Sequence, residues 1–292
     1  MASVSVRVPA TTANLAACFD SMGCALGLYN TLTFTQGEEL SFSGCEAAYQ
    51  NRENLAYQAY CRVLTALGLP EEGVHIDIHA EIPVSRGLGS SAALLAAGAV
   101  AANALHGNAL DRRQLLALCT ELEGHPDNVA PALLGGLTAS LMDGREVVSA
   151  SYAVHPDWRF VALIPDFPLS THAARAVLPA AVPYADAVFN TAHAAVLPAA
   201  LMSGDEALLA AALRDRLHQP YRRGLIEEYD AVEAMAAENG CRAFCISGAG
   251  PTLLALTTDP TFAPRMAEGV KTLAHRWQVR ELPVDTVGAA IL

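Results

Sequence analysis

Residues 83–92 constrain the fold more than any other stretch, because they join a predicted strand to a predicted helix through a short turn with two glycines. Apolar and polar residues alternate over 74–82, which is the period-two pattern of a half-buried strand. Pro83 ends that strand, since proline has no N–H to donate to a ladder. The Ala- and Leu-rich run 92–105 then predicts a buried helix that ends near Gly107.

This strand, turn and helix favour a site for an anion. Glycines let the backbone approach a ligand closely, and the free N–H groups at a helix start face negative charge. Ser90 and Ser91 could cap the helix, hold phosphate oxygens or bind a metal. A tight turn before a well-capped buried helix explains the same residues, and the turn alone does not decide between the two interpretations.

The site would work without an essential lysine on the phosphates. The chain contains no Gly-x4-Gly-Lys-[Ser/Thr] string, and Lys271, near the C-terminus, is its only lysine. Unless Lys271 serves, backbone amides, a metal and arginine have to neutralise the phosphate charge.

Length, charge and cysteine content narrow the class of protein. A chain of 292 residues predicts two domains, and we place the boundary near 155–157, giving domains 1–155 and 156–292. The net charge of −12 argues against a nucleic-acid partner, and the longest apolar stretch, 92–102, is too short to cross a membrane. The N-terminus lacks the basic start and apolar run of a signal peptide. The seven cysteines include no Cys-x2-Cys pair, so we expect reduced core thiols, Cys241 and Cys245 among them, in a cytoplasmic protein.

Three polar segments of the N-terminal half hold candidate site residues. Asn14 and Asp20 lie in a loop of small residues after the first predicted strand, where such side chains usually cap local backbone. A helix is predicted over 51–67, and Asn54, near its start, is expected to cap it. A further helix from Asp111 ends in a Glu-Leu-Glu-Gly-His run over 121–125. Its glutamates oppose the helix dipole, and a nearby Mg²⁺ would remove that cost, although two solvated glutamates are the commoner case.

The C-terminal half contributes two arginines and a glycine turn. Ser170 or Thr171 is a natural N-cap, which places Arg175 near the start of a helix. Arg222 follows a predicted helical region over 184–217. The string Ser-Gly-Ala-Gly at 247–250 predicts a turn between two strands, and further strands are predicted near 277–282 and 286–291.

Several of these strings resemble the GHMP kinases. The stretch 83–92 matches their phosphate-binding pattern, Pro-x3-Gly-Leu-Gly-Ser-Ser-Ala, without a gap. Other strings resemble the homoserine kinases of that family: Glu-Gly-His-Pro-Asp-Asn-Val-Ala-Pro at 123–131, Asn-Leu-Ala-Tyr at 54–57, a Ser-Thr-x3-Arg-x3-Pro string at 170–179 and Pro-Tyr-Arg at 220–222. The segment 9–20 is also similar, but it carries Ala-Ala-Cys at 16–18 where the family has Gly-Pro-Gly, and those residues adopt positive φ less readily.

The resemblance implies an α+β, two-domain GHMP kinase fold, with an N-terminal domain like ribosomal protein S5 domain 2 and a ferredoxin-like C-terminal domain. It implies that ATP and Mg²⁺ are used to phosphorylate the hydroxyl of L-homoserine, on the way to threonine. We also expect a homodimer, although the sequence alone does not give the oligomeric state. Asp20, Glu123 and Arg175 would be catalytic, and Ser90, Ser91 and Glu123 would hold the metal. The substrate would contact Asn14, Asp20, His125, Asn128, Thr171, Arg175, Arg222 and Gly248. The nucleotide would contact Asn54, Pro83, Arg86, Gly87, Leu88, Gly89, Ser90, Ser91 and Ala92.

Two other functions remain open at this point. One is a GHMP kinase for another small alcohol such as mevalonate, although the arginine pair favours an amino-acid substrate. The other is a non-catalytic nucleotide-binding sensor on the same fold, which the presence of Asp20 and Glu123 disfavours. It is also open which residues would bind the metal: either Ser90 or Ser91, and either Glu121 or Glu123. Asp20 is expected to position the substrate rather than to act as a base, because an ordinary carboxylate is a weak base for an alcohol.

Overall fold

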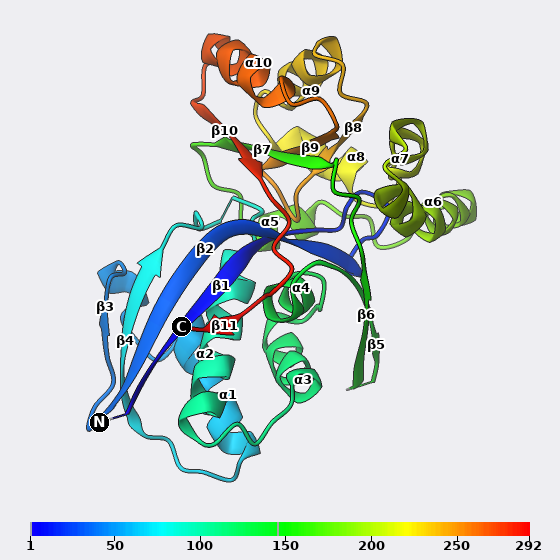
Figure 1. The fold of residues 1–292 in the computed structure, drawn as a ribbon. Coiled ribbons are helices and arrows are strands. Elements are labelled where there is room, and N and C mark those ends of the chain that lie inside the picture. Colours follow the sequence, from blue (N-terminus) through cyan, green and yellow to red (C-terminus); the bar gives the residue numbers. More distant parts are fainter. Residues whose placement is uncertain (1, 145) are drawn as a thin grey trace.

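The computed structural model describes residues 2–144 and 146–292, which form two sheets with helices packed against each (Figure 1). The first sheet has the strand order β11-β1-β2-β4-β3, with β5 pairing β2 and β6. Its strands are β1 (Ser3–Ala13), β2 (Met22–Gly37), β3 (Ser41–Ser43), β4 (Gly73–Ala80), β5 (Leu137–Asp143), β6 (Glu146–Tyr152) and β11 (Ala290–Ile291). The helices of this half are η1 (Ala47–Tyr49), α1 (Leu55–Ala66), α2 (Ser90–Leu105), α3 (Arg112–Glu123) and α4 (Val129–Leu134).

The second sheet has the order β10-β7-β9-β8, and all its neighbours are antiparallel. Its strands are β7 (Arg159–Pro165), β8 (Ala243–Ile246), β9 (Leu253–Thr257) and β10 (Trp277–Leu282). The helices are α5 (Thr171–Ala176), α6 (Tyr184–Ser203), α7 (Glu206–Ala212), α8 (Gln219–Arg222), η2 (Arg223–Leu225), α9 (Tyr229–Glu238), α10 (Phe262–Gly269) and η3 (Val270–Thr272). Helices separate the first strand from the second and the third from the fourth, so this half has the predicted ferredoxin-like order.

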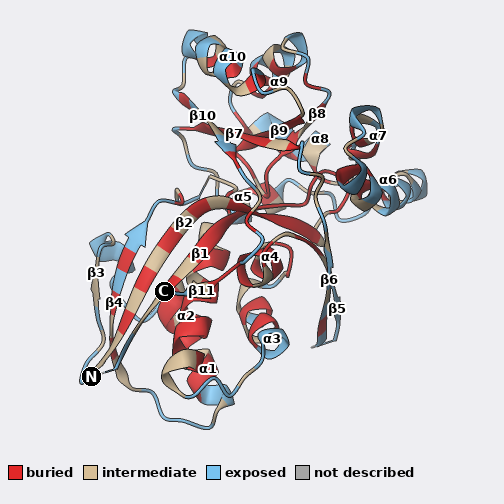
Figure 2. Cartoon of the chain, viewed as in Figure 1, coloured by how far each residue is buried: buried red, intermediate tan, exposed pale blue. Residues whose placement is uncertain are grey.

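Helix α2 is the centre of the N-terminal half, and Figure 2 shows it buried along most of its length. Its alanines pack against β1 and α1, and Gly98 lets α1 come closer still. A Cβ at Gly98 would lie 2.0 Å from the carbonyl oxygen of Ala56. This close contact explains why a glycine lies within a helix whose other residues favour helix formation.

The structure confirms most predicted elements and corrects their ends. Helix α2 begins at Ser90, two residues before the predicted start, because Gly89 is its N-cap at φ 68°; neither serine caps it. Helix α1 begins at Leu55 rather than near residue 51, since Asn54 is its N-cap and accepts from the Ala56 amide at 3.0 Å.

The last predicted strand belongs to the other half of the molecule. We expected the strand near 286–291 to complete the C-terminal sheet, but the strand found there, β11, pairs with β1 of the first sheet. The pairing of Val6 with Ile291 supplies a partner for an edge of β1 that would otherwise be unpaired. Sequence pattern predicts that a strand exists but not which sheet it joins.

Other sequence expectations can be checked directly. All seven cysteines are free; Cys241 and Cys245 are buried as predicted, whereas Cys45 and Cys61 are only partly buried and so are not core residues. Lys271 is exposed and pairs with Glu268 at 2.6 Å. In the described residues, no helix has both the length and the apolar character that a membrane span requires.

Candidate active site

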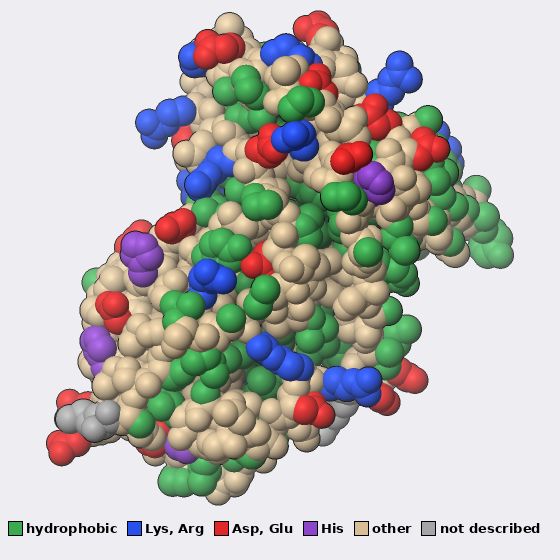
Figure 3. All heavy atoms as spheres, in the orientation of Figure 1, with side chains coloured by type: hydrophobic (Ala, Val, Ile, Leu, Met, Phe, Trp, Pro, Cys, Tyr) green, Lys and Arg blue, Asp and Glu red, His purple; other side chains and the backbone are tan. Residues whose placement is uncertain are grey.

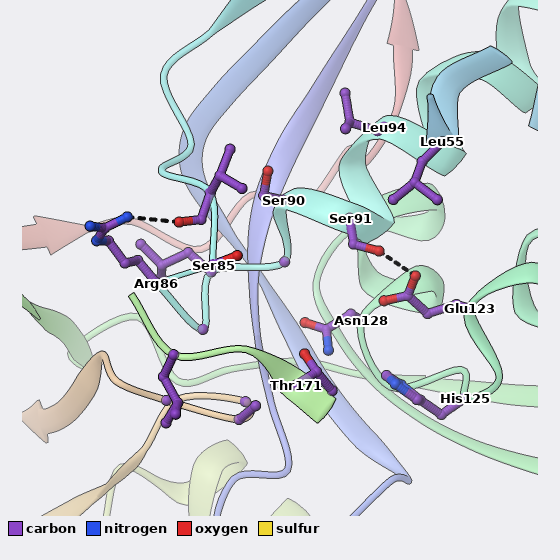
Figure 4. Close-up of a pocket in the computed structure, with 18 of the residues that line it drawn as sticks. Leu55, Ser85, Arg86, Ser90, Ser91, Leu94, Glu123, His125, Asn128 and Thr171 are labelled. Atoms are coloured by element: carbon purple, nitrogen blue, oxygen red, sulfur yellow. Dashed lines mark hydrogen bonds between the residues drawn. The ribbon is translucent and has the colours of Figure 1, made fainter. Parts of the chain in front are cut away.

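A cavity of about 380 Å³ lies where loops from the two halves of the chain meet (Figure 4). This volume is within the range of small-molecule sites. The cavity brings together every residue predicted for the site except Ala92, which is fully buried in α2. The residues that line it are Asn14, Asp20, Asn54, Pro83, Arg86, Gly87, Leu88, Gly89, Ser90, Ser91, Glu123, His125, Asn128, Thr171, Arg175, Arg222 and Gly248, together with ten that were not predicted.

Two positions in the turn before α2 require glycine. Gly87 and Gly89 have φ of 39° and 68°, in the left-handed region. A Cβ at Gly89 would lie 1.9 Å from Thr11 Oγ1, and one at Gly87 would lie 2.2 Å from the carbonyl oxygen of Ser247. The glycine turn of the C-terminal half therefore packs directly against the turn that starts α2.

The amides of this turn are available to a ligand. Within the described chain, the backbone N–H groups of residues 87–92 donate to no protein acceptor. Residues 87–91 of this group line the cavity at the start of a sixteen-residue helix, which is a favourable position for phosphate. The guanidinium of Arg86 donates to the carbonyl oxygens of Val84 and Asp166 at 2.9 and 2.7 Å, and Figure 4 shows one bond from it to a carbonyl oxygen.

The structure distinguishes among the four candidate metal ligands, Ser90, Ser91, Glu121 and Glu123. Ser91 donates a hydrogen bond to Glu123, whereas Ser90 points away from that carboxylate (Figure 4). Glu121 pairs with Arg62 at 2.7 Å outside the cavity. Burial raises the pKa of Glu123, and the hydrogen bond from Ser91 only partly opposes this effect. A partly buried carboxylate beside a hydroxyl offers hard oxygen ligands, so among the four candidates Ser91 and Glu123 fit Mg²⁺ best.

Asp127 is a part of the site that we did not predict. It is 2% exposed, and its Oδ1 lies 2.6 Å from Nδ1 of His125 and 3.0 Å from the Asn128 amide nitrogen. Burial alone would lower the pKa of His125, but Asp127, Glu123 and Asp20 together raise it. Asp127 lies inside the string that resembles homoserine kinases, which was the only sequence signal for it.

The two arginines have different surroundings. Arg175 forms a two-pronged ion pair with Asp20, with distances of 2.7 and 3.0 Å. Arg222 is 1% exposed and donates only to carbonyl oxygens and a histidine; within the described residues it pairs with no carboxylate. Burial, and then the charge of Arg175, lowers the pKa of Arg222. A buried cation without a counter-ion is costly, so an anionic ligand in the cavity would bind it favourably.

Both side-chain groups of Asn14 form hydrogen bonds within the protein. Its Nδ2 donates to the carbonyl oxygen of Gly248 at 2.8 Å, and its Oδ1 accepts from the Asp20 amide at 2.9 Å. Asn14 thereby ties the loop that carries Asp20 to the C-terminal half. The same loop takes positive φ at Ala16, 59°, although alanine replaces the glycine of the resembling family.

The opposite end of the cavity is apolar. Leu55, Leu94 and Val84 line it, with Tyr49 and Pro83, and Figure 4 shows Leu55 and Leu94 beyond Ser91. Both side-chain groups of Asn54 are used inside the protein, since its Nδ2 donates to the carbonyl oxygen of Tyr49 at 2.9 Å. Sequence patterns could not identify the two leucines, because a leucine in a buried helix looks the same whether it packs in the core or lines a cavity.

Comparison with known proteins agrees with this geometry. The models for the GHMP kinases N terminal domain and the GHMP kinases C terminal domain match residues 54–136 and 198–275. A homoserine kinase of Clostridium botulinum is 43% identical over 291 residues, covering 99% of this chain and 98% of its own. One of Picosynechococcus is 43% identical over the whole of both chains. The crystal structure of homoserine kinase from Cytophaga hutchinsonii superposes with a TM-score of 0.89 at 28% identity, covering 99% and 97% of the two chains. This chain belongs to the GHMP kinase family, and the three relatives named above are homoserine kinases.

Proposed function

We propose that this protein is a homoserine kinase, which transfers the γ-phosphoryl group of ATP to the side-chain hydroxyl of L-homoserine and forms O-phospho-L-homoserine for threonine biosynthesis. One observation carries the choice of substrate: the cavity is lined by residues 87–91, whose amides have no acceptor in the described chain, and also by the buried guanidinium of Arg222, which pairs with no carboxylate there. The first group suits phosphates, and the second suits the carboxylate of an amino acid.

The nucleotide would lie along the turn and the apolar end of the cavity. Amides of Gly87, Leu88, Gly89, Ser90 and Ser91 would hold its phosphates, and the surface around Tyr49, Leu55 and Leu94 would take the base. Ser91 and Glu123 would hold Mg²⁺, which when bound would neutralise charge that develops on the transferred group. The protein's own contribution is mainly to position the reactants and exclude water.

The amino acid would lie at the other end. Arg222 and Arg175 would bind its carboxylate, while Asp20 would bind its ammonium group. The Asp20–Arg175 pair thus offers both signs of charge to a zwitterion. His125 and Asn128 would orient the hydroxyl, and Thr171, Gly248 and Asn14 would shape the pocket around it. Since carboxylates are weak bases toward alcohols, we assign Asp20 a positioning role.

A substrate panel tests this function. ADP release would be followed with homoserine, mevalonate, galactose and shikimate as acceptors. We expect turnover with homoserine alone. Turnover with mevalonate in place of homoserine would contradict the assignment, and nucleotide binding without turnover of any acceptor would support a sensor instead.

Arg222→Ala tests the carboxylate site within the same assay. We expect the KM for homoserine to rise about 100-fold with little change in the KM for ATP, because a buried charged contact is lost. Arg223→Ala is the matched control, since Arg223 is half-exposed and pairs with Asp230 and Glu233 outside the cavity. A homoserine KM that does not change in Arg222→Ala would defeat the assignment of this arginine.

We also propose a cytoplasmic homodimer with domains 1–155 and 156–292. Free cysteines support a reducing compartment. Helix α6 supports self-association, because its 20 residues contain a single charged residue, Asp186, and Figure 3 shows hydrophobic side chains on its exposed surface. The large apolar residues exposed on α6 are Tyr184, Val188, Val196 and Met202.

A further inference from the structure

His218 lies directly behind Arg222 and belongs to no function assigned so far. It is completely buried at the start of α8, and its ring stacks on Phe19 with the centroids 5.1 Å apart. Its Nε2 lies 2.9 Å from the carbonyl oxygen of Ala16, and its Nδ1 lies 3.3 Å from Nη1 of Arg222.

These two contacts fix where the ring carries its proton. A carbonyl oxygen can only accept a hydrogen bond, so Nε2 must carry the hydrogen. A guanidinium nitrogen can only donate, so Nδ1 must be bare. The neutral ring protonated on Nε2 is the single form that satisfies both neighbours.

The charges around His218 agree with a neutral ring. Burial, with help from the charge of Arg222, lowers the pKa of His218, although the carboxylates of Asp215 and Asp20 act in the opposite direction. Asp215 lies 3.6 Å from Nε2, and it already accepts from the backbone amides of Leu217, His218 and Gln219. These bonds hold the segment that carries the ring.

The ring in turn restricts the guanidinium of Arg222. Nε of Arg222 donates to the carbonyl oxygen of Ala174 at 3.0 Å, and Nη1 is shared between His218 and the carbonyl oxygen of Gly248. In the part of the chain that the structure describes, Nη2 donates to no protein group. The contacts on the other two nitrogens thus leave Nη2 as the one that can meet a ligand in the cavity.

We propose that His218 is a positioning residue for Arg222: as an acceptor at Nδ1, it orients the guanidinium so that Nη2 binds the substrate carboxylate, and it thereby makes the enzyme selective for acceptors that carry one. This inference rests on the proposed homoserine kinase activity. A positioning error of about 1 Å can cost 10²-fold in rate, so the effect is large enough to measure.

Three variants test the role. His218→Gln keeps one acceptor and one donor, with a reach close to that of the ring. His218→Asn keeps both but is too short to reach Ala16 and Arg222 together, and His218→Leu has neither. We expect the KM for homoserine to increase in the order Gln, Asn, Leu, reaching about 10- to 100-fold, while the KM for ATP stays within about twofold.

A ligand without a carboxylate distinguishes a positioning role of His218 from a general structural effect of the substitutions. The compound 3-aminopropan-1-ol is homoserine without its carboxylate, and its inhibition constant against homoserine should be the same in all three variants and the wild type. His106→Asn, at a histidine that contacts Glu72 outside the cavity, should leave every constant unchanged.

The outcomes distinguish this proposal from the one on which it rests. A wild-type protein that does not phosphorylate homoserine would overturn the proposed function. An active wild type with an unchanged homoserine KM in His218→Asn, or with equal losses for homoserine and 3-aminopropan-1-ol, would overturn only the role of His218. If His218→Leu does not fold, the comparison of Gln with Asn decides.

Discussion

The environment of Glu123 is consistent with the metal-binding role that we propose for it. It is the last residue of α3, where a negative charge opposes the helix dipole, and burial raises its pKa. The sequence predicted that one of Glu121 and Glu123 binds the metal. Only the structure could separate them, because the direction of a side chain at a helix end depends on what it packs against. Glu121 meets Arg62, and Glu123 meets Ser91.

The raised pKa predicts a pH-dependent need for Mg²⁺. A carboxyl whose pKa is raised keeps its proton to a higher pH than an ordinary glutamate, and that proton competes with the metal. The Mg²⁺ concentration for half-maximal activity should therefore increase as the pH falls, beginning above the pH at which an exposed glutamate protonates. Glu123→Gln should lose most activity, and Glu121→Gln should behave as wild type. An equal Mg²⁺ requirement in wild type and Glu123→Gln would refute this assignment.

Helices α1 and α2 illustrate what an element's sequence does and does not reveal. The Ala/Leu-rich pattern predicted α2 within two residues, since so uniform an apolar run forms a helix in any buried setting. The pattern could not explain Gly98, because its reason is a contact with Ala56 on another helix. It also missed Leu55 and Leu94 as cavity residues for the same reason: both depend on how α1 and α2 meet.

Gly98→Ala tests this close approach. The added methyl would overlap the backbone of α1, and we expect a loss of about 1–3 kcal/mol in the free energy of unfolding. Gly224→Ala is the control, since a Cβ there meets nothing within 4 Å, and it should be neutral or slightly stabilising by about 0.4–1 kcal/mol. Urea denaturation measures both, and equal stability of the two variants would contradict the packing.

At the scale of the molecule, the site forms only because distant segments meet. The resemblance to homoserine kinases placed Asp20, Arg175 and Arg222 in one site, but the sequence could not show that Asp20 and Arg175 pair with each other across 155 positions. Its only indication of Asp127 was the position of that residue inside the string 123–131, and it gave none of the role that we propose for His218, because both depend on contacts rather than on residue type. Such contacts between far-apart segments are fixed by the packing of the two halves, which no local pattern encodes.

The apolar surface of α6 predicts the state of assembly. Val188→Lys, at a side chain that is 51% exposed, should shift the protein from dimer to monomer in sedimentation velocity, because a charge would be buried in the interface. Leu69→Lys, at a 39% exposed residue of the other half, should not. A wild-type protein that sediments as a 30.6 kDa monomer would exclude the homodimer.

A crystal structure with a non-hydrolysable ATP analogue, Mg²⁺ and L-homoserine would test the central claim most directly. We predict that the phosphates accept hydrogen bonds from the amides of Gly89, Ser90 and Ser91, and that the homoserine carboxylate lies on Nη2 of Arg222, in the same cavity. Phosphates bound away from that turn, or a homoserine whose carboxylate points away from Arg222, would contradict it.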